Sequence, residues 1–397
     1  MRSQLSGVFA LMAAVTCSLS TTGPAHAAEP MGPCALPREK VHHSEGLTTW
    51  NDVYLRPLGR VDAALVFLRF PDSEPVLSTA KIAASHIPET RRFFSAASYG
   101  KFDYRLEPIS GWFSMPAPST SYNISRDWAA EDRKRYLADA MAATDPSVDF
   151  ARYDVVFFVA DPDAPGVDPD ATKIVNLADP ISADGKDFSY IGTVFEAQPP
   201  DRHVLAHESA HTFDLPDLYK RPAPDPSEGT WNTEVGDWDL MGDQKGLAPD
   251  PFAWHKWKFG WLERDQVGCL VGAGTIRQTL FPVEVPGGRK LLVIRTGRHS
   301  ALAVEVRGRY GNDREACHTG VLVYRVRSDI PSGQGPIQVV DSNPARSGCR
   351  GKSVHPPLAD APFTVGQQFR DPKTGTVIRV LRSGPGGSYT VEAARGR

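Results

Sequence analysis

The feature that most constrains this chain is a pattern of two histidines and a glutamate near its middle. Residues 207–211 read HESAH, with His207 and His211 four positions apart. Four residues make about one helical turn, so on an α-helix both imidazoles lie on one face and can meet a single metal ion. Glu208 is offset around the same helix and can stand beside that ion to take a proton from water. The pattern predicts a metal-bearing helix, and a surface helix with a solvated His/Glu face is the alternative.

The residues before the motif favour a helix that starts just upstream. Pro199 and Pro200 block an earlier helix, and Asp201 is a residue type that often caps a helix N-terminus. We therefore expect Asp201 to be the N-cap. His203 lies on the same face one turn before the motif, where a partly exposed position at the helix start is favoured over a role as metal ligand.

A catalytic zinc ion needs three protein ligands and one open position, so a third side chain must come from downstream. Pro216 cannot continue the helix, and a turn there can bring Asp217 back to the metal. Asp214 falls near the site by helical spacing and is the rival, either as ligand or as a partner that orients one. Glu234 is disfavoured because its surroundings, WNTEVGDWD, have little helical character. We predict Asp217 as the third ligand beside the two histidines.

The first 27 residues have the form of a secretory signal peptide. Arg2 supplies a positive start, an apolar run occupies 7–19, and AHA at 25–27 is a small-residue cleavage site. We expect cleavage after Ala27 and a secreted, extracellular protein, with a lipid anchor at Cys17 as the alternative. No other stretch approaches the ~18 apolar residues that a membrane span requires, so no span is expected in the mature chain.

Four cysteines remain after that cleavage, namely Cys34, Cys269, Cys317 and Cys349. An even number in an exported chain favours disulfides, and three pairings are possible. Because Cys317 and Cys349 lie in one region we favour that pair, which leaves Cys34 with Cys269. A Cys34 thiolate that caps the metal is the alternative.

The hydrophobic pattern changes near residue 262. Before it, apolar runs at 63–70, 153–159, 174–177 and 190–195 predict strands, and helical spacing appears at 79–97 and 125–143. After it, short β-branched runs separated by turn residues predict a β-sandwich, at 291–296, 302–307, 321–326, 337–340, 377–382 and 389–393. We therefore expect an α+β domain followed by an all-β domain that caps it. The predicted divisions are a signal peptide at 1–27, an N-terminal extension at 28–60, a catalytic domain at 61–266 and a β-sandwich at 267–397.

The stretch HESAHTFDLPDLY at 207–219 resembles the zinc-binding signature of the immune inhibitor A-type metallopeptidases, which are secreted relatives of the metzincins. SYGKF at 98–102, GDWDLMG at 236–242 and AWHKWKFGWL at 253–262 are similar to three further segments of that family, in the same order. The resemblance covers about residues 60–265. It implies a zincin domain with a central twisted mixed sheet, and it places Met241 in a methionine turn beneath the metal.

Two departures from that family affect the expectations. The family usually has glycine where Asp214 stands, because the chain bends there. We expect Asp214 to take the left-handed conformation, which aspartate tolerates better than most residues. In addition, only about 30 residues separate the signal peptide from the first strand, so latency through a folded propeptide is not expected.

These features together predict a secreted zinc endopeptidase that hydrolyses peptide bonds in proteins or peptides through a metal-activated water, with Glu208 as the general base. The alternatives are an exported zinc-containing binding or adhesion protein and a zinc exopeptidase. The net charge of −3 gives no basic footprint, so nucleic acid is not an expected partner. We expect a monomer.

An aspartate-rich loop, DPDAPGVDPD at 161–170, raises a second metal hypothesis. Carboxylates are the hard oxygen ligands that Ca²⁺ prefers, but the loop lacks the EF-hand spacing. A solvated loop is therefore favoured over a calcium site. The candidate ligands are Asp161, Asp163, Asp168 and Asp170.

Overall fold

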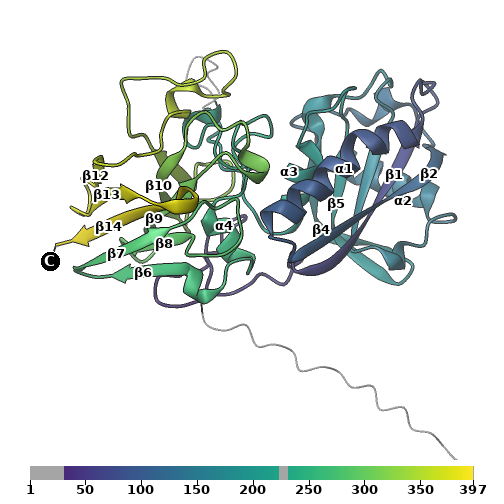
Figure 1. Ribbon diagram of the computed structural model, residues 1–397. Helices are drawn as coiled ribbons and strands as arrows, with labels where there is room; N and C mark the ends of the chain where they lie inside the picture. Colours follow the sequence, from purple (N-terminus) through teal and green to yellow (C-terminus); the bar gives the residue numbers. More distant parts are fainter. Residues whose placement is uncertain (1–30, 223–230, 397) are drawn as a thin grey trace, which may run out of the picture. The chain divides into compact units, whose positions relative to one another are not determined.

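A five-stranded sheet positions the residues of the predicted metal site (Figure 1). The computed structural model describes residues 31–222 and 231–396. Four of the five strands run parallel, and the last, β4, runs antiparallel to its neighbour β5. The order is β2-β1-β3-β5-β4, so β4 is an edge strand. The strands are β1 (Gly59–Arg69), β2 (Phe102–Ser114), β3 (Val155–Ala160), β4 (Lys173–Ala183) and β5 (Lys186–Val194).

Helices cover both faces of this sheet, which explains why its inner strands are apolar along most of their length. Ala63 of β1 belongs to the same hydrophobic cluster as residues of α1 (Thr79–Ala97) and α3 (Val204–Thr212). The next residue, Ala64, points to the other face and packs in a cluster with α2 (Ala130–Thr144). The site helix α3 is therefore held against one face of the sheet.

Two further sheets share a hydrophobic cluster in the second half of the chain. Both contribute to it, for example through Leu302 of one sheet and Val391 of the other. The first has the order β11-β10-β9-β8-β6 and consists of β6 (Val267–Val271), β8 (Leu291–Arg295), β9 (Ser300–Arg307), β10 (Gly320–Arg327) and β11 (Ile337–Val340). The second has the order β12-β13-β14-β7 and consists of β7 (Gly274–Leu280), β12 (Gln368–Arg370), β13 (Val377–Ser383) and β14 (Tyr389–Arg395).

The coarse α+β prediction is confirmed, because a mixed sheet with helices precedes a region made of strands. The pattern did not predict four of the strands, β2, β6, β7 and β12. Helix α2 begins at Ala130 instead of residue 125, because the chain turns first, with the Trp128 N–H donating to the Ser125 carbonyl at 3.1 Å.

A single hydrophobic cluster crosses the predicted boundary at residue 266. Phe94 of α1, Trp254 of α4 (Ala253–Lys258) and Tyr324 of β10 all belong to it. The described residues from Met31 onward accordingly form one compact unit. The predicted boundary therefore falls within a continuous core, and the division into two domains stays a prediction.

Both favoured disulfides are present. Cys34 bonds to Cys269, and Cys317 bonds to Cys349. Cys34 is thus engaged in a disulfide, which contradicts the alternative in which its thiolate caps a metal. The two bonds fit a protein made for an oxidising compartment.

The predicted signal peptide, residues 1–27, lies outside the described residues. In the part of the chain that is described, none of the helices has the length and apolar character needed to span a bilayer.

Candidate metal centre

The helix predicted from the HExxH pattern is present as α3, but it begins later than expected. Its N-cap is His203 and its first helical residue is Val204, so the prediction of Asp201 as N-cap is wrong. The Asp201 carboxylate instead accepts a hydrogen bond from Gln244 and pairs with Lys245, each at 3.2 Å. Those contacts hold it away from the backbone N–H groups of the first turn.

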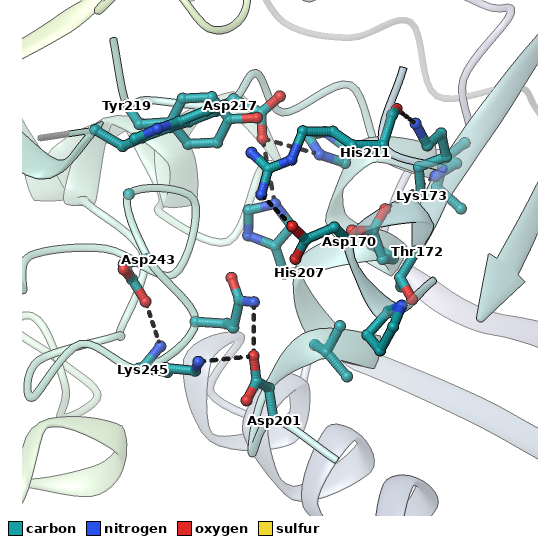
Figure 2. A pocket seen from close by; sticks show the side chains of 18 of the residues that line it. Asp170, Thr172, Lys173, Asp201, His207, His211, Asp217, Tyr219, Asp243 and Lys245 are labelled. Atoms are coloured by element: carbon teal, nitrogen blue, oxygen red, sulfur yellow. Dashed lines mark hydrogen bonds and ion pairs between the residues drawn. The ribbon is translucent and has the colours of Figure 1, made fainter. Parts of the chain in front are cut away.

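His207, His211 and Asp217 point toward one another (Figure 2). Oδ1 of Asp217 lies 3.2 Å from Nε2 of His207 and 3.3 Å from Nε2 of His211. One ligand atom from each residue lies within 4.8 Å of the others, and the described residues contain no second such group of three. Ligands at about 2.0–2.1 Å from a tetrahedral zinc ion are roughly 3.3 Å apart. The two separations from Asp217 therefore match a tetrahedral zinc site, and the two imidazoles lie within 4.8 Å of each other.

Backbone carbonyls orient both imidazoles. Nδ1 of His207 lies 3.1 Å from the Leu240 carbonyl, and Nδ1 of His211 lies 2.8 Å from the Leu215 carbonyl. A carbonyl oxygen can only accept, so each Nδ1 carries the proton and donates it, which leaves Nε2 as the ligand atom. Asp217 is held in turn by Ser332, whose hydroxyl donates to Oδ2 at 3.1 Å. All three candidate ligands are thus fixed by a second set of hydrogen bonds.

The charges in this group favour a cation at its centre. Burial by itself lowers the pKa of both imidazoles, but Asp217 more than offsets this, so the pKa of His207 is raised and that of His211 is raised to about 9. Burial alone would likewise raise the pKa of Asp217. The charge of His211 and hydrogen bonds from both imidazoles instead hold the pKa of Asp217 well below its usual value. Without a metal, the Asp217 carboxylate therefore favours the protonated form of both imidazoles.

Glu208 is buried beside the three ligands and is oriented by the edge strand. Its Oε2 accepts a hydrogen bond from the backbone N–H of Ile174 in β4 at 2.9 Å. No described residue hydrogen-bonds to Oε1, so one carboxylate oxygen is fixed and the other is free for a ligand. Burial raises the pKa of Glu208 above the usual value, although both histidines oppose the rise. A raised pKa suits a carboxylate that must accept and later return a proton.

Asp214, the rival third ligand, points elsewhere. Its φ of 67° is the left-handed conformation that was expected at this bend. Its carboxylate receives two hydrogen bonds from Arg38, one of them at 3.0 Å, and lies 3.2 Å from Nδ1 of His43 and 3.3 Å from Nζ of Lys258. Asp214 is therefore the buried counter-ion of a basic cluster and stands apart from the three converging side chains.

The other candidates from the sequence also lie apart from that group. His203 is buried against the Phe93 ring, with 5.3 Å between the ring centroids. Glu234 is not among the three side chains that converge.

The aspartates of the 161–170 loop are directed to separate partners. Asp161 accepts from the Ser73 hydroxyl, and Asp170 pairs with Arg126 at 2.8 Å. The described residues therefore give the calcium hypothesis no cluster of carboxylates.

Sequence reasoning missed the contribution of the N-terminal segment, defined here as residues 38–45. The His43 ring stacks on the ring of His211, with 5.5 Å between the centroids. Glu45 lies 2.9 Å from Nε2 of buried His255, whose Nδ1 lies 2.7 Å from Asp239. Residues 38–45 show no periodic pattern, and their composition is polar. Neither property predicts contacts with residues so distant in the sequence.

An open cleft of about 960 Å³ leads to the three converging side chains. Lys173, Ile174 and Asn176 line it from the edge strand β4, and Tyr219 lines it from the chain beyond Asp217. Figure 2 shows Lys245 between Asp201 and Asp243 elsewhere in the same cleft. The cleft therefore brings an edge strand and charged side chains to the three converging side chains.

Two comparisons with known proteins assign no family to this chain. No protein-family model matches the chain, and a search of curated proteins found no match. The resemblance to the immune inhibitor A-type metallopeptidases thus rests on the sequence segments quoted above.

Proposed function

We propose that this protein is a secreted zinc endopeptidase of the zincin type, in which His207, His211 and Asp217 hold the metal and Glu208 is the general base. The convergence of the His207 and His211 imidazoles on Asp217 Oδ1, at 3.2 and 3.3 Å, is the observation that carries the proposal. Three protein ligands leave a position open, as catalytic zinc sites do and structural sites with four protein ligands do not. Met241 is fully buried and follows Leu240, whose carbonyl orients His207. This position supports the prediction that Met241 belongs to a methionine turn.

Zinc bound there would supply a water of lowered pKa and would polarise the carbonyl of the scissile bond. Glu208, held through Oε2 by the Ile174 N–H, takes the proton of the attacking water on Oε1. As the peptide C–N bond breaks, the same carboxyl returns the proton to the leaving nitrogen. Burial, which raises the pKa of Glu208, keeps this exchange possible near neutral pH.

The edge strand β4 supports a peptide as the substrate. It pairs with β5 on one side, and no described strand pairs with its other side. An extended peptide can add to such an edge through main-chain hydrogen bonds. Ile174, which binds the general base, belongs to this strand, so a peptide aligned along β4 would pass beside Glu208.

Digestion of a library of long peptides by the zinc-loaded protein tests this proposal. We expect cuts at internal positions, which stop when a chelator removes the metal and return when zinc is restored. Zinc content is measured on the same samples.

The other outcomes identify the alternatives. One bound zinc per chain with no cleavage of any peptide would favour an exported zinc-containing binding protein. Removal of terminal residues alone would make the enzyme an exopeptidase.

A further inference from the structure

Hydrolysis by this route needs a hydrogen-bond donor for the oxyanion that forms as water adds to the carbonyl carbon, besides the group that takes the water's proton. Most donor side chains around the cleft already have partners. Burial, together with the charge of the nearby Asp217 carboxylate, raises the pKa of the Tyr219 hydroxyl above its usual value. The partnered donors are Arg126 with Asp170, Lys173 with the Arg126 carbonyl, Asn232 with Asp243, and Gln244 and Lys245 with Asp201.

His42 and Asn176 are different. Both side chains are exposed and line the cleft. Nε2 of His42 lies 3.4 Å from Nδ2 of Asn176, and among the described residues neither side chain has another hydrogen-bond partner. When the Asn176 amide donates to Nε2, the proton of the imidazole is on Nδ1. The pair then retains N–H groups that a ligand in the cleft can use.

Ser332 connects His42 to Asp217, one of the proposed metal ligands. The Ser332 N–H donates to the His42 carbonyl at 3.0 Å, and the Ser332 hydroxyl donates to Oδ2 of Asp217 at 3.1 Å. On its other side the His42 ring contacts the ring of His43, with 4.1 Å between centroids, and His43 stacks on His211. An exposed imidazole is thus held at a defined place beside the ligands.

Asn176 connects the His42 imidazole to the strand that orients Glu208, the proposed general base. It follows Ile174 by two residues on β4, and the Ile174 N–H binds Glu208. His42 is therefore anchored toward Asp217 through Ser332 and toward the strand that orients Glu208 through Asn176.

We propose that His42, oriented by Asn176, is a catalytic residue that donates a hydrogen bond to the oxyanion formed during peptide hydrolysis, an inference that rests on the proposed function. The oxygen of water bonds to the carbonyl carbon, the π-electron pair moves onto the carbonyl oxygen, and the water's proton passes to Glu208. His42 transfers no proton. When the carbonyl reforms, the C–N bond breaks and Glu208 protonates the leaving nitrogen. The N-terminal segment then belongs to the active site.

The test compares zinc-loaded wild type with His42→Ala on a peptide that the wild type cleaves. We expect kcat to fall by about 10²- to 10³-fold, as for loss of an oxyanion donor elsewhere, with KM and zinc content little changed. A phosphinic peptide, which carries the tetrahedral geometry, should lose a comparable factor in affinity, while a product peptide should bind as before.

Three further variants serve as controls. His42→Gln, which keeps an N–H donor, should recover part of the loss. Asn176→Ala should have a smaller effect than His42→Ala, and His318→Ala, at an exposed histidine in the second half of the chain, should have none.

Unchanged kcat in folded His42→Ala would overturn the inference while leaving the proposed function intact. Loss of zinc from that variant would also overturn it, because His42 would then be part of the metal site. If His42→Ala does not fold, His42→Gln and Asn176→Ala decide in the same way, and wild-type kcat in both overturns the inference. A zinc-loaded wild type that cleaves no peptide would overturn the proposed function and this inference with it.

Discussion

Asp214 and Asp217 lie three residues apart and have different surroundings. Asp217 faces two imidazoles, whereas Asp214 faces Arg38 and Lys258. The left-handed conformation of Asp214 reverses the chain after α3, so that the next acidic residue returns to the helix face. Sequence spacing could favour Asp217 because Pro216 forces a turn, but it could not assign Asp214 to a basic cluster. Arg38 lies far away in the sequence and carries no pattern that points to Asp214.

The two aspartates form a matched pair of variants. Asp217→Asn should lower zinc affinity by more than ~100-fold, because even partners that only orient a ligand cost 10- to 100-fold. Asp214→Asn should retain zinc, and its amide tolerates the left-handed conformation. Titration with a competing zinc indicator measures both. Equal zinc loss in the two variants would contradict the assignment of Asp217 as third ligand.

Asp214→Asn should also change the dependence of stability on pH. Burial alone would raise the pKa of Asp214, but Lys258, His43 and Arg38 hold that pKa well below its ordinary value of 3.8. A lowered pKa in the folded state means that the ionised carboxylate contributes stability above about pH 4 and that this contribution declines as the pH falls further. Removing one partner from such a buried cluster costs about 3–5 kcal/mol.

Urea unfolding of the metal-free proteins checks this pH dependence. The difference in unfolding free energy between wild type and Asp214→Asn should be largest near neutral pH and should shrink below pH 4. A difference that stays constant between pH 7 and pH 3 would show that the charge of Asp214 is not what stabilises the cluster.

At the scale of elements, the regular part of the fold could be predicted and the N-terminal segment could not. Helix α1 occupies the predicted range 79–97, because its apolar residues recur at helical spacing. Strand β2 was missed since about half of its residues are exposed and its apolar run is broken by Pro108 and Gly111. The N-terminal segment lacks any repeat, and contacts with residues distant in the sequence, among them α4, Asp214 and Ser332, determine its position.

The two disulfides allow the role of this segment to be measured. Cys34→Ser with Cys269→Ser removes the bond that holds the chain just before the segment, whereas Cys317→Ser with Cys349→Ser removes a bond within the second half. Each double variant should lose about 2–5 kcal/mol of stability. Only the first should also lower kcat, because residues 38–45 contact His211 and Asp214 and contain His42.

Peptide cleavage is assayed at a temperature where both double variants remain folded by circular dichroism. Equal kcat values for the two would mean that the segment keeps its place without the Cys34–Cys269 bond.

At the scale of the whole molecule, the β-rich region contributes to the core of the site-bearing region. Glu305 of β9 is fully buried, accepts from the Ala253 N–H of α4 at 2.7 Å and pairs with Arg307 at 2.6 Å. Arg307 also pairs with Asp313 at 2.7 Å. The change in sequence pattern near residue 262 lies close to the point where strands replace helices along the chain. It could not reveal this buried network, whose members look like ordinary polar residues of strands and turns.

A chain limited to residues 31–266 should therefore fail to fold cooperatively. It lacks Cys269, Glu305 and Tyr324, and it exposes the cluster that now continues across the boundary. Thermal unfolding and zinc titration, with residues 31–397 as the control, measure the effect. A sharp unfolding transition together with tight zinc binding by the short chain would establish independent domains instead.

The most direct test of the central claim is the rate of casein cleavage by Glu208→Ala, compared with wild type at equal zinc content. Glu208 is not one of the three ligands, so the variant should bind one zinc ion per chain as the wild type does. General acid and base catalysis contributes about 10²- to 10⁴-fold, and the account predicts a loss of that size in the rate. Cleavage by the zinc-loaded variant at the wild-type rate would contradict the proposed mechanism.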